Sequence, residues 1–260
     1  TNEPASVPVT GPRHEDLVAL AAELWAARGE SLVVCGSDDP GAQALAVQAK
    51  LLKLYPEERS ATVASTAAYK VLSDQRENET DEAKKLALLE KMARLLQIAN
   101  KGASKPSWSN LRNESNHWLD LERYARAEPP LRKLIEAFTG DENHGDSVAL
   151  YVTSDLGLVL MKQEKTEEAA AVLGTLVESG KAPLEASRNY ALCLTGWVEF
   201  EDTGARIVPG VAEDPETFDK AIEQLVKIVN TTGAREKWTD PWYQAKFDLS
   251  FGYLRYSEID

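Results

Sequence analysis

Apolar residues recur at steps of three and four along most of the chain, which is the spacing that places them on one face of an α-helix. Segment 81–99 shows this most clearly, with a leucine-rich stripe that Asn100-Lys101-Gly102 closes as a stop signal. The same spacing predicts further helices over residues 14–28, 41–54, 57–72, 108–121, 125–138, 147–163, 166–179, 184–200, 215–229 and 241–257.

Polar segments separate these helices and predict loops at 73–80, 139–146 and 201–214. One β-branched run, residues 31–35, is typical of a short strand and leads into a turn. No alternation of strands and helices extends beyond that run. We therefore predict an all-α fold with at most one short strand, near 31–35.

The most regular helix pair lies between Thr153 and Leu176. Leu156-Gly157 and Leu160 mark its first helix, and Ala169, followed by two leucines at helical spacing, marks its second. A unit of this kind cannot bury its apolar face alone and must stack on similar units. The pattern therefore favours an interaction scaffold over a catalyst.

This helix pair resembles the tetratricopeptide repeat, a helix–turn–helix unit of about 34 residues. Leu156 and Gly157 match the leucine–glycine step of that family, Leu160 stands at its large aromatic position, and Ala169 matches the small residue of its second helix. The resemblance implies a right-handed superhelix of antiparallel helix pairs, an α-solenoid.

The other copies match less closely, so the predicted solenoid is irregular. In 108–138, Glu114-Ser115 replaces the leucine–glycine step. Leu194-Thr195, Val198 and Ala221 fit the pattern if 201–214 is an insertion, and Leu249-Ser250 looks like the first helix of one more repeat. Even in the best copy, Glu164 and Thr166 stand where the family prefers glycine and tyrosine.

In the resembled family the first helices line a concave groove that receives a peptide, a helix or a partner subunit. The resemblance implies groove positions at Tyr151, Ser154, Leu158, Met161 and Lys162, at Arg112 and Asn116, and at Gln244, Phe247, Phe251 and Arg255. Burial of the apolar members, with a polar rim for specificity, would supply the binding energy. We therefore expect a protein–protein interaction scaffold and no enzyme.

A shorter resemblance runs from Leu17 to Leu52, where a helix, the run SLVVCG and a second helix look like a segment of molybdopterin-type oxidoreductase domains. The cofactor-binding residues and cluster cysteines of that family have no counterpart here, so we expect no cofactor. The turn at 31–41 keeps one alternative open, a cofactor-binding or enzyme-associated domain. A structural segment of a larger multi-repeat protein is a further alternative.

Composition and charge limit the partners. The 260 residues carry a formal net charge of −13, which disfavours nucleic acid and anionic membrane. No apolar run approaches the roughly 20 residues that cross a bilayer. Residues 1–13 are typical of a disordered leader, 14–106 of an N-terminal helical unit, and 107–260 of the repeats. The Pro- and Thr-rich start without methionine fits an extracytoplasmic, periplasmic or secreted protein, and otherwise the protein is expected in the cytoplasm.

Few residues suggest chemistry. Cys35 and Cys193 lie in apolar runs and are expected as buried small side chains. His144 stands among acidic residues, but these lack the alternation of a calcium loop, and a solvated turn is expected. The aromatic C-terminal helix either packs on a preceding helix or covers a partner or a second copy of the chain. The predicted partner is thus a protein, with self-association through this helix as one form.

Overall fold

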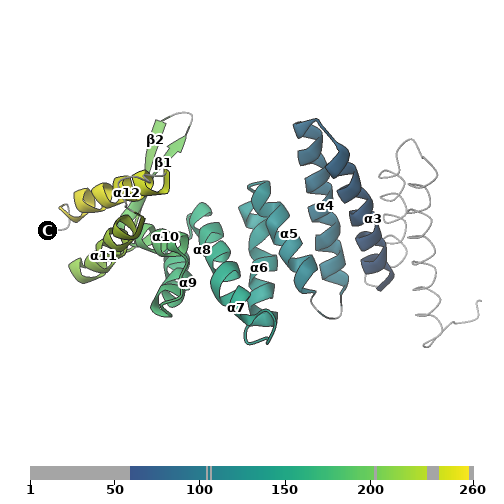
Figure 1. Ribbon diagram of the computed structural model, residues 1–260, viewed down its shortest axis with the longest axis horizontal. Helices are drawn as coiled ribbons and strands as arrows, with labels where there is room; N and C mark the ends of the chain where they lie inside the picture. The colour runs from purple at the N-terminus through teal and green to yellow at the C-terminus, as the bar shows by residue number, and fades with distance from the viewer. Residues whose placement is uncertain (1–58, 104, 106, 202–203, 233–239, 258–260) are drawn as a thin grey trace, which may run out of the picture. The chain divides into compact units, whose positions relative to one another are not determined.

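The computed structural model describes residues 59–103, 105, 107–201, 204–232 and 240–257 (Figure 1). These residues are mostly helical and contain one two-stranded antiparallel sheet. They divide into two units, of which the first ends at Arg123 and the second begins at Tyr124. The predominance of helix is confirmed, and the sheet corrects the all-α prediction. The predicted leader at 1–13 and the strand near 31–35 lie outside the described residues.

The described residues of the first unit form three helices that pack in chain order, α3 (Arg59–Asn78), α4 (Glu82–Gly102) and α5 (Trp108–Asp120). Asp81 caps α4, because its Oδ1 accepts hydrogen bonds from the backbone N–H groups of Ala83 and Lys84. The α3–α4 contact buries a compact apolar cluster of Ala68, Val71, Leu72, Met92 and Leu95.

Helix α3 is longer than predicted. Residues 73–78 were predicted to be a loop because they are polar, yet they continue the helix to Asn78. Asp74, Glu77 and Asn78 face solvent, so their polarity matches an exposed helix surface. The helix ends where the Glu79 carboxylate accepts hydrogen bonds from the next two backbone N–H groups.

The second unit begins with helix α6 (Tyr124–Phe138) and the short α7 (Gly145–Ser147). A π-helical turn, η1 (Val148–Val152), leads into α8 (Thr153–Lys162), and α9 (Thr166–Glu178) follows. Helices α8 and α9 approach so closely that a Cβ on Gly157 would lie 2.4 Å from the Leu173 side chain. Gly157 is thus a packing requirement of this helix pair.

The predicted helix 184–200 is wrong in its last five residues. Helix α10 (Leu184–Thr195) ends at Gly196, and the chain enters strand β1 (Gly196–Glu201), which pairs antiparallel with β2 (Gly204–Pro209). Residues 201 and 204–209 of the predicted loop at 201–214 therefore belong to strands, and Val198 belongs to a strand and not to a repeat helix. Gly196 has φ 86°, a conformation that other residues rarely adopt.

The hairpin is closed at its base by the end of α10. The backbone N–H groups of Val211 and Ala212 donate to the carbonyls of Cys193 and Leu194, at 2.9 and 3.1 Å, and satisfy acceptors that a helix end leaves open. A Cβ on Gly210 would lie 2.1 Å from the Leu194 carbonyl oxygen, so this passage needs glycine.

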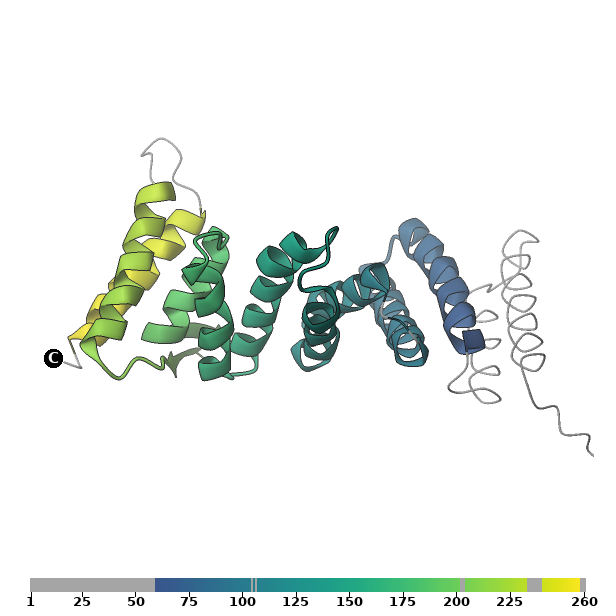
Figure 2. The same ribbon diagram turned by 90° about the horizontal axis from the view of Figure 1, so that it is seen from below.

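Two helices complete the second unit, α11 (Pro215–Thr232) and α12 (Asp240–Tyr256). They lie side by side in both views (Figures 1 and 2). The sequence predicted both, together with α4, α5, α6 and α9, with bounds that differ from the structure by at most three residues.

Candidate interaction surface

Helix α12 carries apolar side chains on two opposite faces. One face is buried and includes Ala245 and Phe251. The other carries Tyr243, Phe247, Tyr253 and Leu254, whose exposed fractions are 54, 43, 54 and 60%. Four large apolar side chains gathered on one exposed helix face are the usual mark of a contact surface.

The buried face of α12 is held firmly against α11. Ala245 packs with Ile228 and Val229 in one apolar cluster. A Cβ on Gly252 would lie 2.8 Å from the Ile222 side chain, so this side chain packs directly on the α12 backbone. The rings of Phe218 and Tyr256 meet edge to face, with centroids 5.7 Å apart. The exposed face is therefore presented on a fixed helix.

A buried ion pair joins α12 to α10. Asp248 is 4% exposed, and its Oδ2 accepts a hydrogen bond from Arg188 Nε at 2.5 Å. Gln244 Nε2 donates to the other carboxylate oxygen at 3.2 Å. A cavity of about 380 Å³ opens beside this pair and is lined by Leu184, Glu185, Arg188, Ile228 and Gln244. Gln244, one of the predicted groove residues, thus borders a real depression between α10, α11 and α12.

Comparison of α12 with α8 explains why the exposed face of α12 is unusual. If Leu249-Ser250 corresponds to Leu156-Gly157, Tyr253 corresponds to Leu160 and Leu254 to Met161. Leu160 and Met161 are 0 and 6% exposed, whereas Tyr253 and Leu254 are 54 and 60% exposed. In α8, the helix face that contains Gly157 packs against α9. Within the described residues, no second helix covers the equivalent face of α12.

The β1–β2 hairpin is tied by charge to the turn between α8 and α9. Lys162 Nζ donates to Glu199 of β1 at 3.3 Å, and Arg206 of β2 bridges Glu199 and Glu164 at 2.6 and 2.8 Å. Burial opposes ionisation of Glu199, but the hydrogen bonds from Arg206 and Lys162 outweigh it and lower its pKa. The hairpin is therefore fixed against the preceding helix pair.

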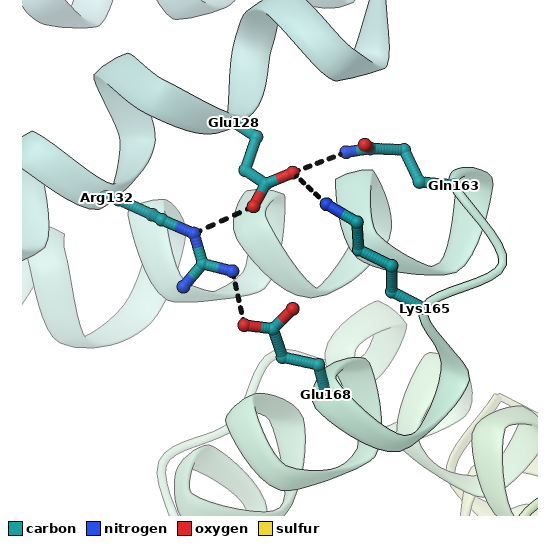
Figure 3. A network of polar contacts seen from close by, with 5 residues as sticks. All are labelled: Glu128, Arg132, Gln163, Lys165 and Glu168. Atoms are coloured by element: carbon teal, nitrogen blue, oxygen red, sulfur yellow. Dashed lines mark hydrogen bonds and ion pairs between the residues drawn. The ribbon is translucent and has the colours of Figure 1, made fainter.

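A second polar network joins α6 to the same turn (Figure 3). Glu128 of α6 accepts hydrogen bonds from Arg132 at 2.8 Å, from Lys165 at 2.7 Å and from Gln163 at 2.8 Å. Arg132 also donates to Glu168 of α9. Burial opposes ionisation of Glu128, but the three donors outweigh it and lower its pKa to about 2. These residues therefore link α6 to the α8–α9 helix pair.

The predicted groove residues in the second unit fall into two classes. Met161 and Phe251 are 6 and 9% exposed, so both belong to the core and we remove them from the binding surface. The rest reach solvent fully or in part: Tyr151, Ser154, Leu158, Lys162, Gln244, Phe247 and Arg255. Their role as a groove stays a prediction, and Lys162 is already engaged with Glu199.

Arg112 and Asn116 lie on α5 in the first unit, and both are half-buried. Their proposed contact with a partner stays a prediction.

The sequence-based set missed Tyr243, Tyr253 and Leu254 on α12 and Ile207 on the hairpin, all more than half exposed. A signal was present for α12. Tyr243, Phe247, Ser250 and Leu254 follow steps of four, three and four, which define one helix face. Copying family positions onto α12 obscured that face, because the copied positions straddle its exposed and buried sides.

The cysteine and the two histidines of the described residues are engaged in ordinary packing and turns. Cys193 is a free, fully buried thiol, as predicted, and burial raises its pKa to about 12. Tyr69 Oη and His117 Nε2 are hydrogen-bonded at 3.0 Å, and burial lowers the pKa of His117, although the charge of Asp120 opposes this. His144 closes a turn on Asp141 at 2.8 Å.

Two observations bear on the kind of site that the described part of the chain holds. Across residues 59–257, apart from the short undescribed gaps, no three His, Cys, Asp or Glu side chains are grouped to hold a metal ion. None of the described helices has the length and apolar character needed to cross a membrane. Cys35 and the turn at 31–41 lie outside the described residues, so the cofactor alternative stays a prediction.

The sequence matches no known protein-family model and no curated protein. The resemblances to tetratricopeptide repeats and to molybdopterin oxidoreductase domains therefore stay predictions.

Proposed function

We propose that this chain is a protein–protein interaction module built from irregular, tetratricopeptide-like helix pairs. Repetition within the chain supports the architecture. Three second helices share one stripe, a small residue followed by apolar residues four and seven positions later: Ala127, Leu131 and Leu134; Ala169, Leu173 and Leu176; Ala221, Leu225 and Ile228. All nine side chains are at most 4% exposed.

The first helices α5 and α8 support the same proposal because they end in the same turn. Glu122 and Glu164 both adopt positive φ, at 54° and 59°. In each turn the following N–H donates to a carbonyl five residues earlier, Arg123 to Trp118 and Lys165 to Leu160. This is the Schellman motif that closes many helices. The two turns lie 42 residues apart, so the repeat is longer than the family's unit.

One observation carries the functional proposal, namely the exposed face of α12. Tyr253 and Leu254 stand where α8 carries the buried Leu160 and Met161, yet they remain more than half exposed. Covering each large apolar side chain contributes about 1.5–3 kcal/mol, so a helix laid on this face gains affinity. The binding mode we propose is therefore helix packing on α12, with the cavity beside Arg188 at its edge.

The test is affinity capture from the native host with tagged chains. We expect the wild-type chain to retain a set of proteins that Leu254→Lys loses, because a lysine on the packing face would be buried without a partner. Leu86→Lys is the matched control, since Leu86 is also an exposed leucine, at 52%, but lies on α4 of the first unit. Cross-linking before lysis and quantitative mass spectrometry measure the difference.

Loss of the same proteins from both variants would count against the proposal, since the effect would not be specific to α12. Equal retention by all three chains would place the binding surface elsewhere. The remaining predicted positions on α8, Tyr151 and Leu158, would then be the next to test.

A further inference from the structure

The exposed face of α12 has features that favour one particular occupant. Its residues Tyr243, Phe247, Ser250 and Leu254 lie on one line along the helix, over a length of about 16 Å at 1.5 Å per residue. The two inner positions of this line hold a large residue, Phe247, and a small one, Ser250. Steps of four, three and four read the same in both directions, so the line can meet a copy of itself that runs the opposite way.

The α8–α9 pair shows how such a face is covered in this chain. The two helices are antiparallel neighbours joined by a short turn, and the small Gly157 receives the large Leu173. Ser250 is the small residue of α12 at the corresponding position, and it is exposed. A suitable occupant must therefore bring a large side chain over Ser250 from an antiparallel helix.

We propose, building on the function proposed above, that this occupant is a second copy of the chain, with two α12 helices packed antiparallel about a two-fold axis. In that arrangement Phe247 of each copy lies over Ser250 of the other, and Tyr243 lies opposite Leu254. Each of the two Phe247–Ser250 contacts then repeats the packing of the large Leu173 against the small Gly157. A two-fold contact of this kind closes on itself and yields a dimer.

Charge on this face is compatible with self-pairing. The whole chain carries −13, which opposes association of two copies in general. Among residues 243–256 of α12, however, Lys246 is the charged residue on the exposed face, and no carboxylate lies there. Asp248 points into the core, where Arg188 holds it. The acidic surface is thus kept away from the proposed contact.

The experiment uses two variants of the full chain, Tyr243→Glu and Leu254→Lys, and follows mass by sedimentation over a range of concentrations. Both positions are more than half exposed, and each new charge suits its end of the helix dipole, so folding should be unaffected. We expect the wild-type chain to dimerise and each variant alone to dimerise roughly tenfold or more weakly. Leu86→Lys, as control, should behave like the wild-type chain.

Mixing the two variants is the decisive step. In an antiparallel pair, Glu at position 243 of one chain faces Lys at position 254 of the other, and the native Leu254–Tyr243 contact survives on the other side. The equimolar mixture should therefore dimerise within about threefold of the wild-type strength, because the one Glu–Lys ion pair of the mixed dimer offsets the cost of burying its charges. Parallel pairing brings equal positions together and gives no such recovery.

Several outcomes would overturn the inference. A wild-type chain that stays monomeric up to about 1 mM has no dimer of useful strength. A dimer that both variants leave intact lies on another surface, and a mixture without recovery excludes antiparallel pairing. If the chain is monomeric but Leu254→Lys still loses captured host proteins, the interaction function stands and the second copy is wrong. If it is monomeric and capture is unchanged, both the second copy and the binding role of α12 are wrong.

Discussion

Helices α5 and α8 end in the same backbone turn but fill the same internal position differently. In α8, Leu156 and Gly157 are apolar and small, and Gly157 lets α9 approach. In α5, the equivalent residues are Glu114 and Ser115, 3 and 0% exposed. Glu114 accepts a 2.6 Å hydrogen bond from Asn100 of α4, and Ser115 Oγ donates to the Arg112 carbonyl.

The difference teaches that one helix-pair frame tolerates two kinds of contact. The α8 position depends on shape, because no atom fits beyond the glycine Cα. The α5 position depends on satisfied hydrogen bonds, because a buried carboxylate is costly without donors. The turns differ in their ion pairs: the side chains of all four turn residues are exposed, and Glu164 and Lys165 bind Arg206 and Glu128.

The largest effect is expected at the shape-dependent position. Gly157→Ala places a Cβ 2.4 Å from the buried side chain of Leu173, so the helices must separate or Leu173 must leave its position. We expect a loss of about 1–3 kcal/mol in the free energy of unfolding. Ser115→Ala, the matched change in α5, removes a single hydroxyl that bonds within its own helix, and about 1 kcal/mol or less is expected. Urea denaturation measures both, and equal losses would abolish the distinction.

An intermediate effect on the free energy of unfolding is expected from the ion pairs of the turn between α8 and α9. The pKa of Glu128 is about 2, below its ordinary 4.5, so its contribution is fully present above pH 4.5 and is lost as the pH falls towards 2. We expect a loss of about 1–2 kcal/mol over that range, limited because Arg132 and Lys165 are partly exposed. Thermal unfolding at a series of pH values records it. In Lys165→Met the slope below pH 4.5 should become shallower, and an unchanged slope would exclude the network as its source.

The smallest effect is expected at the two turn residues with positive φ. Glu122→Gly relieves an unfavourable backbone conformation and should stabilise the protein by up to about 1 kcal/mol. Glu164→Gly gives the same relief but removes the carboxylate that binds Arg206, so its net effect should be close to zero. Differential scanning calorimetry compares the two. A larger gain at Glu164 would show that its ion pair contributes little.

Most helices could be predicted from the sequence because apolar spacing and capping residues act locally. The segment 81–99 illustrates this, with Asp81 as N-cap and Gly102 as the last helical residue. The hairpin was missed although it had a local signal: the strands contain Trp197, Val198 and Ile207, and Asp202-Thr203-Gly204 is a turn sequence. Its apolar residues also fit helical spacing, and the choice between the two depends on close backbone contacts of Gly196 with Val208 and of Gly210 with Leu194 at the end of α10.

The surface of α12 could be predicted only in part. The aromatic residues near the C-terminus marked the helix as a contact candidate. Which of its sides is buried depends on α10 and α11, through Gly252 against Ile222 and Arg188 against Asp248. These contacts join residues 30 and 60 positions apart, which spacing along a single helix does not reveal. Phe251 was therefore assigned to the surface although it belongs to the core.

The closed base of the hairpin allows the strands to change in length without a change in the helix packing. Because Val211 and Ala212 seal the end of α10 directly, the helical frame on either side does not depend on how far β1 and β2 extend. The strands can lengthen or shorten by residue pairs while every side chain keeps its face. The hairpin is thus a place where this chain can acquire new recognition elements without altering the helix packing that supports them.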